Sequence, residues 1–163
     1  MVPAFHRSRF QCSTTNRAIV NIGGIANITW LPTQGSVVGF DTGPGNGLMD
    51  QWINAHHNKP YDEQGAWASK GHVNNLLLNQ YLKHPFFQCH PPKSTGPETF
   101  NYNWVRSHVE QLQAVSTTGE ITATDVQATL LELTASTIAA SISELNPSQT
   151  PLEIFVCGGG AHN

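Results

Sequence analysis

The hydrophobic positions in the first quarter of the chain follow the pattern of short β-strands. Residues 18–22 (AIVNI) and 26–31 (ANITWL) are rich in β-branched and aromatic side chains, and the glycines Gly23 and Gly24 lie between them. This pattern predicts a β-hairpin with a glycine tip. A third run, residues 36–40 (SVVGF), predicts another strand, so the three segments together predict a meander.

After the third strand, the apolar residues recur at the spacing of an α-helix. The pattern is clearest over residues 122–145, where Thr124 is of the type that caps a helix N-terminus. Asn46 is the expected N-cap of an earlier helix, and Pro85 is expected to stop another. The helices predicted before the long one span residues 46–57, 72–84 and 102–113.

The last apolar run, residues 152–157 (LEIFVC), predicts a buried strand, and Gly158, Gly159 and Gly160 follow it. Strands with helices between them predict an α/β fold with a mixed sheet. A buried strand followed by three glycines normally leads into a helix that packs back on the sheet. The sequence stops at Asn163, before any such helix, so we expect an incomplete fold.

Composition and charge narrow the class of protein. The 163 residues suffice for one domain with a real core, only 12% of them are charged, and the net charge is -3 with neutral histidines. This balance argues against a nucleic-acid or anionic-membrane partner, which would select a basic face. No apolar run approaches the roughly 20 residues of a membrane helix. The first residues also lack the apolar core of a signal peptide.

The cysteines and histidines indicate neither a disulfide framework nor a metal site. Cys12, Cys89 and Cys157 are odd in number and far apart, which favours a reducing cytoplasm. His56 and His57 are adjacent, and no H-x-x-x-H or C-x-x-C pair occurs. We therefore expect the histidines to be scattered packing or surface residues, and no metal-ligating residue is predicted.

Three predicted strand ends carry glycine-rich turns: NIGGIAN, FDTGPGN and CGGGAHN. In open α/β sheets ligands bind beyond the carboxyl ends of the strands, and glycines let backbone N–H groups approach phosphate oxygens. Asp41 would project into the same crevice, where a carboxylate can bind a metal, orient a hydroxyl or act as a general base. Each turn could instead be purely structural, and Asp41 could cap its own turn.

Two common phosphate-binding signatures are absent. The chain contains no G-x-x-x-x-G-K-[ST], and GGGAHN does not satisfy G-x-G-x-x-G. The sequence therefore argues against a P-loop protein and against a Rossmann dinucleotide fold.

Six segments, in this order, resemble the anhydro-N-acetylmuramic acid kinase family: VNIGGIANITWLP, GFDTGPGNGLMDQWI, YDEQGAWASKG, PPKSTGPETFN, DVQATLLELTASTIA and VCGGGAHN. The resemblance implies an actin-like, RNase H-like ATPase fold of two domains with the site in the cleft between them. It implies ATP with Mg²⁺, a homodimer, and 1,6-anhydro-N-acetylmuramic acid from peptidoglycan as substrate. The family's reaction opens the anhydro ring and phosphorylates O6, which gives N-acetylmuramic acid 6-phosphate.

The resemblance also implies roles for individual residues. Asp41 matches the family's catalytic aspartate. The residues implied in nucleotide binding are Gly23, Gly24, Gly158, Gly159 and Gly160. Those implied in substrate binding or in shaping the site are Thr42, Gly43, Gly45, Asn46, Lys93, Ser94 and Thr95. On composition, residues 91–99 could also be an ordinary proline-rich surface loop.

Family members begin with a strand and a G-T-S-x-D-G loop that grips the ATP phosphates, and neither occurs here. We therefore expect residues 1–17 to be the tail of the first actin-like domain and residues 18–163 to be a C-terminally truncated second domain. Three hypotheses follow: an ATP-dependent sugar kinase, a non-catalytic remnant that folds, dimerises or binds nucleotide weakly, and a sugar hydrolase. The hydrolase would need a second acid near Asp41, with Asp62, Glu63 and Glu98 as candidates.

Overall fold

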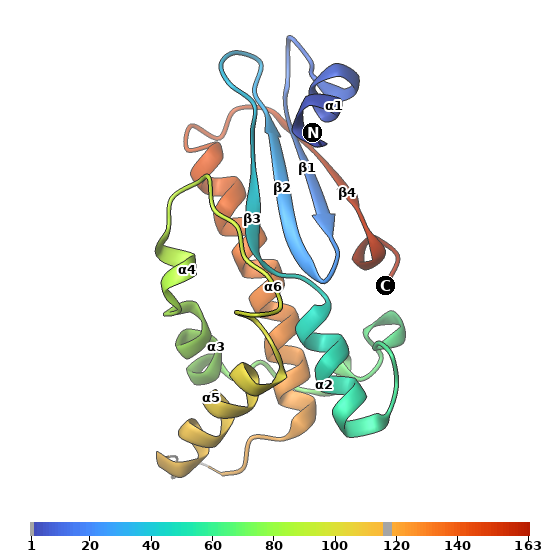
Figure 1. The fold of residues 1–163 in the computed structure, drawn as a ribbon, viewed down its shortest axis with the longest axis vertical. Coiled ribbons are helices and arrows are strands. Elements are labelled where there is room, and N and C mark those ends of the chain that lie inside the picture. Colours follow the sequence, from blue (N-terminus) through green and yellow to red (C-terminus); the bar gives the residue numbers. More distant parts are fainter. Residues whose placement is uncertain (1, 116–118) are drawn as a thin grey trace.

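The computed structural model describes residues 2–115 and 119–163 of the chain. Its four strands form one sheet in the order β3-β2-β1-β4. β2 pairs antiparallel with both β1 and β3, whereas β4 runs parallel to β1, which confirms the predicted mixed sheet (Figure 1). The strands are β1 (Asn16–Ile22), β2 (Ile25–Leu31), β3 (Val38–Pro44) and β4 (Leu152–Cys157).

The predicted helices are present, with two differences. The helix expected over residues 72–84 is shorter, and Pro85 begins a separate short helix, because its missing N–H is not needed at a first helical position. A helix near the N-terminus was not predicted. The helices are α1 (Val2–Phe10), α2 (Gly47–His57), α3 (Asn75–Leu82), α4 (Pro85–Gln88), α5 (Tyr102–Val115) and α6 (Ala123–Leu145), with 3-10 turns η1 (Glu63–Gly65), η2 (Ala68–Lys70) and η3 (Gly159–Ala161).

The helix caps differ from the prediction. Thr122 caps α6 by accepting a hydrogen bond from the N–H of Asp125, so the predicted cap Thr124 is wrong. Asn46 does stand at the N-cap position of α2, but its side chain makes no capping hydrogen bond. The amide of Asn46 is therefore available for other contacts.

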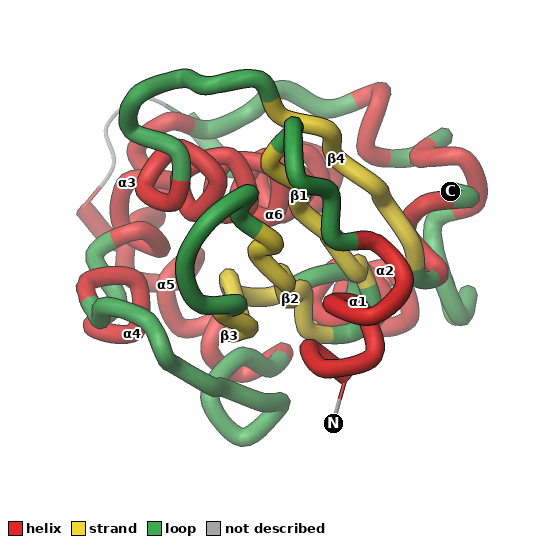
Figure 2. The backbone as a smooth tube through the Cα atoms, turned by 90° about the horizontal axis from the view of Figure 1, so that it is seen from above, coloured by secondary structure: helices red, strands yellow, loops and turns green. Residues whose placement is uncertain are grey.

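Helices cover both faces of the sheet (Figure 2). On one face, α6 packs Ile138 and Ile142 against a buried cluster that includes Val20, Ile28 and Phe40. On the other face lies α1, where His6 Nδ1 is 3.0 Å from the hydroxyl of Thr29. The sheet is thus the middle layer between a long helix and a short one.

The burial predicted for the last strand is wrong. β4 forms as predicted, but five of its six residues are exposed, and Ile154 and Val156 keep 49% and 51% of their surface. The physical reason is position: β4 is an edge strand, while α6 packs mainly over β3 and β2, and α1 packs over β2.

A second core lies beyond one end of the sheet, where α2, α3 and α5 pack around the first half of α6 (Figure 1). Its largest fully buried members are Tyr81, Phe100, Leu77, Leu130 and Leu133. This core holds the start of α2, and with it the turn that leads from β3 into α2. Within the described ranges, no helix is both long and apolar enough to cross a membrane.

Candidate active site

Asp41 lies on β3, which runs on to Pro44 instead of ending at Phe40 as the sequence predicted. Asp41 pairs with Asn27 of β2, and the register shifts at this point, between Ala26 and Asn27. Such a bulge bends a strand and re-aims its side chains. Asp41 is half-buried at the edge of the sheet that β4 does not occupy.

The loop between α4 and α5 runs beside this edge and contacts Asp41 at three points (Figure 1). The N–H of Asp41 donates to the carbonyl oxygen of Lys93 over 3.0 Å. The hydroxyl of Ser94 and the N–H of Thr95 both donate to Oδ2 of Asp41, over 2.8 and 3.0 Å. The structure therefore brings Asp41 together with all three predicted loop residues.

The three loop residues present different groups. Lys93 turns its ammonium group away from Asp41: Nζ donates to the carbonyl oxygen of Phe86 over 3.3 Å and lies 4.8 Å from the centroid of the Phe86 ring. Thr95 has a buried hydroxyl with no hydrogen-bond partner among the described residues. Lys93 thus anchors the loop on α4, while Thr95 offers an unused polar atom beside Asp41.

The glycine tip of the β1–β2 hairpin packs against the turn between β3 and α2. The N–H groups of Gly45 and Asn46 donate to the carbonyl oxygens of Gly24 and Gly23, over 3.0 and 2.8 Å. Gly45 must be glycine because any Cβ there would collide with the carbonyl group of Gly23. The amides of this turn are therefore already used within the protein, and the glycines shape the site through close packing.

The third glycine turn reaches the same place from β4. Gly158 leads from β4 into η3, which contains Gly159 and Gly160. A Cβ on Gly160 would lie 3.0 Å from Nδ2 of Asn46 and 2.5 Å from Cγ2 of Ile22. All three glycine turns singled out in the sequence thus converge on Asn46.

A cavity of about 540 Å³ opens beside this convergence and includes Asn46 and Gly160 in its wall. The carboxylates of Asp50 and Glu132 supply charge, and burial raises the pKa of Asp50 above its usual range. The volume lies within the range of small-molecule sites, and a mostly apolar wall is also typical of such sites. The apolar residues in the wall include Met49, Val73, Leu131 and Ile138.

Asp41 does not belong to the wall of this cavity. Gly45 at the convergence is four positions after Asp41, a span of about 13 Å in extended chain. Thr42 and Gly43 lie on this stretch and are buried. The predicted site residues therefore form two groups. The first is the Asp41 cluster, which consists of Asp41, Lys93, Ser94 and Thr95, and the second is the three glycine turns beside the cavity.

Two polar residues in the wall of the cavity were not among the predicted binding residues: Asp62, which the sequence suggested only as a second acid for a hydrolase, and Asn163, which it did not single out. Both oxygens of the buried Asp62 carboxylate accept backbone N–H groups, from Trp67 and Ala68, each over 2.8 Å. The side chain of Asn163 bridges the same segment, donating to the carbonyl oxygen of Asp62 and accepting from the N–H of Gln64. Asp62 is thus a structural cap, which weakens it as a second acid for hydrolysis. The signal available in the sequence for Asp62 was an acidic residue inside a segment rich in turn-forming residues.

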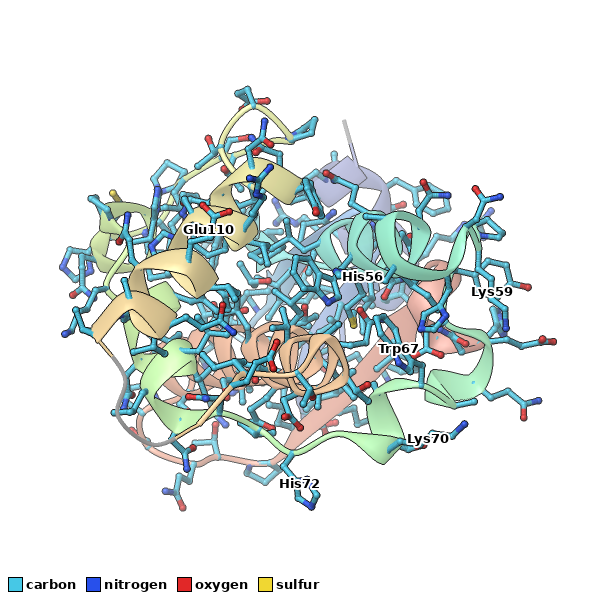
Figure 3. All side chains as sticks on the ribbon, turned by 90° about the horizontal axis from the view of Figure 1, so that it is seen from below. His56, Lys59, Trp67, Lys70, His72 and Glu110 are labelled. Atoms are coloured by element: carbon cyan, nitrogen blue, oxygen red, sulfur yellow. The ribbon has the colours of Figure 1, made fainter. Side chains whose placement is uncertain are left out.

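A smaller hollow of about 230 Å³ has Lys59, Trp67 and Lys70 in its wall. Figure 3 shows these three side chains on the same side of the molecule as His56. The hollow contains no residue of the Asp41 cluster. Over residues 2–115 and 119–163, no group of three or more His, Cys, Asp or Glu side chains is placed to hold a metal ion.

Comparison with known proteins places this geometry in a family context. The model of the family described as anhydro-N-acetylmuramic acid kinase matches residues 1–163. The chain is also similar to curated proteins named anhydro-N-acetylmuramic acid kinase, with 47% identity to that of Haemophilus influenzae and to that of Saccharophagus degradans, and 48% to that of a Shewanella species.

These matches cover 100% of this chain but only 44%, 42% and 42% of the respective relatives. The chain therefore spans less than half the length of the curated relatives that it matches.

Proposed function

Because the chain belongs to the anhydro-N-acetylmuramic acid kinase family, we propose that it forms part of an ATP-dependent kinase acting on 1,6-anhydro-N-acetylmuramic acid. The proposed reaction opens the anhydro ring with water and transfers a phosphoryl group to O6, which yields N-acetylmuramic acid 6-phosphate. The observation that carries the proposal is the Asp41 carboxylate, which is held by one oxygen at a sheet edge. It lies beside the Thr95 hydroxyl, which has no partner in the described part of the chain.

Asp41 is the proposed general base. A water molecule attacks the anomeric carbon while the bond from that carbon to the bridging oxygen breaks, and the electron pair stays on that oxygen, which becomes O6. The carboxylate accepts a proton from the attacking water, a step typically worth about 10²–10⁴-fold in rate. O6 is then the nucleophile for phosphoryl transfer.

The buried hydroxyl of Thr95 supports a sugar site at this position. A buried polar atom without a partner is destabilising, and a ligand hydroxyl can supply the missing hydrogen bond. Thr95 also donates its N–H to Asp41, so a sugar that contacts Thr95 would lie beside the base. We propose that this loop and Asp41 form one wall of the sugar site.

The cavity beside Asn46 is the proposed nucleotide site. Its apolar wall suits a purine ring, and Gly160 brings backbone close to the opening. ATP bound there would supply the γ-phosphoryl group, with Mg²⁺ neutralising phosphate charge. Mg²⁺ is usually bound through substrate phosphates and few protein ligands, so the site needs no dedicated cage of carboxylates.

We extend the proposal to the whole protein. Residues 18–163 would belong to the second of two actin-like domains, and residues 1–17 would be the end of the first. We also propose a cytoplasmic location, because the family's implied substrate is a recycled small molecule. The resemblance to the family further implies a homodimer.

The first test measures ATP consumption by the purified chain with and without 1,6-anhydro-N-acetylmuramic acid. Sugar-dependent consumption is the expected result for a kinase. Opening of the sugar without ATP would instead support a hydrolase. If protein shown by circular dichroism to be folded carries out neither reaction, the result would support a non-catalytic remnant.

Asp41→Asn tests the proposed base. The amide keeps a similar shape but cannot accept the proton, so we expect turnover to fall at least about 100-fold while the sugar still binds. Binding is measured by calorimetry and turnover by ADP release. Glu110→Gln, an exposed charge change on the outer face of α5 (Figure 3), is the matched control. Unchanged turnover in Asp41→Asn would contradict the assigned role.

A further inference from the structure

We propose that Ser94 and Thr95 are positioning residues that hold Oδ2 of Asp41 and thereby leave Oδ1 as the oxygen that takes the proton. This inference rests on the proposed function, because it refines which atom of the base reacts. It gives the proline-rich loop of residues 91–99 a defined task in the reaction.

The geometry distinguishes the two oxygens of Asp41. Oδ2 accepts from the Ser94 hydroxyl at 2.8 Å and from the Thr95 N–H at 3.0 Å. No donor among the described residues contacts Oδ1. Two hydrogen bonds to a single oxygen fix both the position of the carboxylate and its rotation about the bond to Cβ.

Proton transfer to Oδ1 preserves this arrangement. When the O–H bond of the attacking water breaks and its proton moves to Oδ1, Oδ2 remains a carbonyl-type oxygen with two lone pairs for its two donors. A proton on Oδ2 would instead compete with the donors from Ser94 and Thr95 for the same lone pairs. The two hydrogen bonds from Ser94 and Thr95, which together form a clamp on Oδ2, therefore persist in both protonation states of Asp41 only if Oδ1 takes the proton.

The loop is anchored well enough to act as a clamp. Lys93 binds α4 through Nζ and, through its carbonyl oxygen, accepts the N–H of Asp41. α4 in turn packs on β3, because Phe87 occupies the space where a Cβ of Gly43 would lie, 2.8 Å from that position. Because Gly43 has no Cβ, it leaves room for Phe87 and can adopt a φ of 151°. The strand, α4 and the loop thus form one connected unit around Asp41.

The first arm of the test is kinetic. Ser94→Ala removes the hydroxyl donor, and we expect kcat to fall about 10- to 100-fold, with the KM for the sugar changed less than about twofold. Ser94→Thr restores a hydroxyl and should recover kcat to within about threefold. Ser8→Ala, which removes an exposed hydroxyl on α1, is the matched control. A rise in KM with unchanged kcat would overturn the inference, since Ser94 would then be a substrate contact.

The second arm needs no turnover. In the 163-residue chain, nuclear magnetic resonance measures hydrogen exchange of the Thr95 amide, which the hydrogen bond to Asp41 protects. We expect exchange at least about tenfold faster in Asp41→Ala, at unchanged protection of the core strands. An unchanged Thr95 exchange rate would show that the loop does not hold Asp41, and would overturn the inference.

The two arms separate the inference from the proposed function. If the unmodified chain shows no sugar-dependent turnover, the proposed activity fails for this chain, and Thr95 exchange still decides whether the clamp exists. If turnover occurs but Ser94→Ala retains full kcat, the proposed function stands and the positioning role is wrong.

Discussion

Single side chains in this protein differ mainly in whether their polar atoms have partners. One oxygen of Asp41 accepts two hydrogen bonds, whereas in Asp62 each oxygen accepts one hydrogen bond from a backbone N–H group. The two acids are both close to loops, yet the first keeps an oxygen for chemistry and the second does not. A carboxylate whose two oxygens both accept backbone N–H groups is held as a structural group.

Cys12 is a second residue whose environment alters its chemistry. Hydrogen bonding with the Thr14 hydroxyl, at 3.3 Å, and with nearby backbone lowers the pKa of the Cys12 thiol to about 7. Donors favour the charged thiolate, so the thiol becomes reactive at lower pH. We expect the rate of alkylation by iodoacetamide to reach half its maximum near pH 7.

The alkylation is best measured with Cys89 and Cys157 replaced by serine, because both are exposed and would also react. Thr14→Ala should move the midpoint for Cys12 to higher pH, since it removes the first cause of the shift. A midpoint that does not move in Thr14→Ala would assign the shift to backbone donors alone.

The long helix α6 connects the two cores. Its observed N-cap, Thr122, is two residues before the predicted cap, Thr124. Thr122 and Thr124 flank Ala123 and are equally suitable by type, but only the backbone geometry at Thr122 is extended as a cap requires. The Thr122 hydroxyl contacts both the N–H and the carboxylate of Asp125. The N-terminus of α6 is therefore held by a local hydrogen-bonded ring.

Thr122→Ala should lower the free energy of unfolding by about 1 kcal/mol, the usual effect of losing a cap. Thr124→Ala, two residues away, is the matched control and should change it by less than about 0.5 kcal/mol. Urea denaturation followed by circular dichroism measures both. An equal loss in the two variants would mean that the cap is shared or that α6 begins later than Ala123.

For the molecule as a whole, the exposed edge strand β4 is the most unusual surface. Ile154 and Val156 face the same side of the sheet as α6, yet about half of each residue is exposed. Phe155, on the opposite side, contacts Phe10 and the Arg17 guanidinium but remains 39% exposed. An apolar edge of this kind favours pairing with other chains.

Ile154→Lys should therefore reduce concentration-dependent self-association, because a charge on an edge strand opposes strand pairing. Size-exclusion chromatography with light scattering over a range of protein concentrations measures the effect. Leu76→Lys on α3 is the control, since Leu76 is 60% exposed but lies on a helix. Association that persists in Ile154→Lys would place the contact on another surface.

Prediction from sequence succeeded where the signal was local. The glycine tip, the meander and the helices α2, α3, α5 and α6 each depend on residues within a few positions of one another, and each was predicted. Helix α1 was not predicted because its sequence lacks a clear apolar stripe, although it lies against β2 in the folded chain. Boundaries also failed: β3 continues through Asp41 to Pro44, because pairing with β2 holds a glycine-rich segment extended.

Local sequence was thus sufficient to establish the α/β class and the family, since these depend on short segments and their order. Contacts between distant segments required the folded chain. Ser94 and Asp41 are 53 positions apart, and no spacing rule states that one donates to the other. Likewise, LEIFVC is apolar in sequence, but its exposure depends on which helices reach the edge of the sheet. Long-range packing, which sequence periodicity does not encode, places these groups.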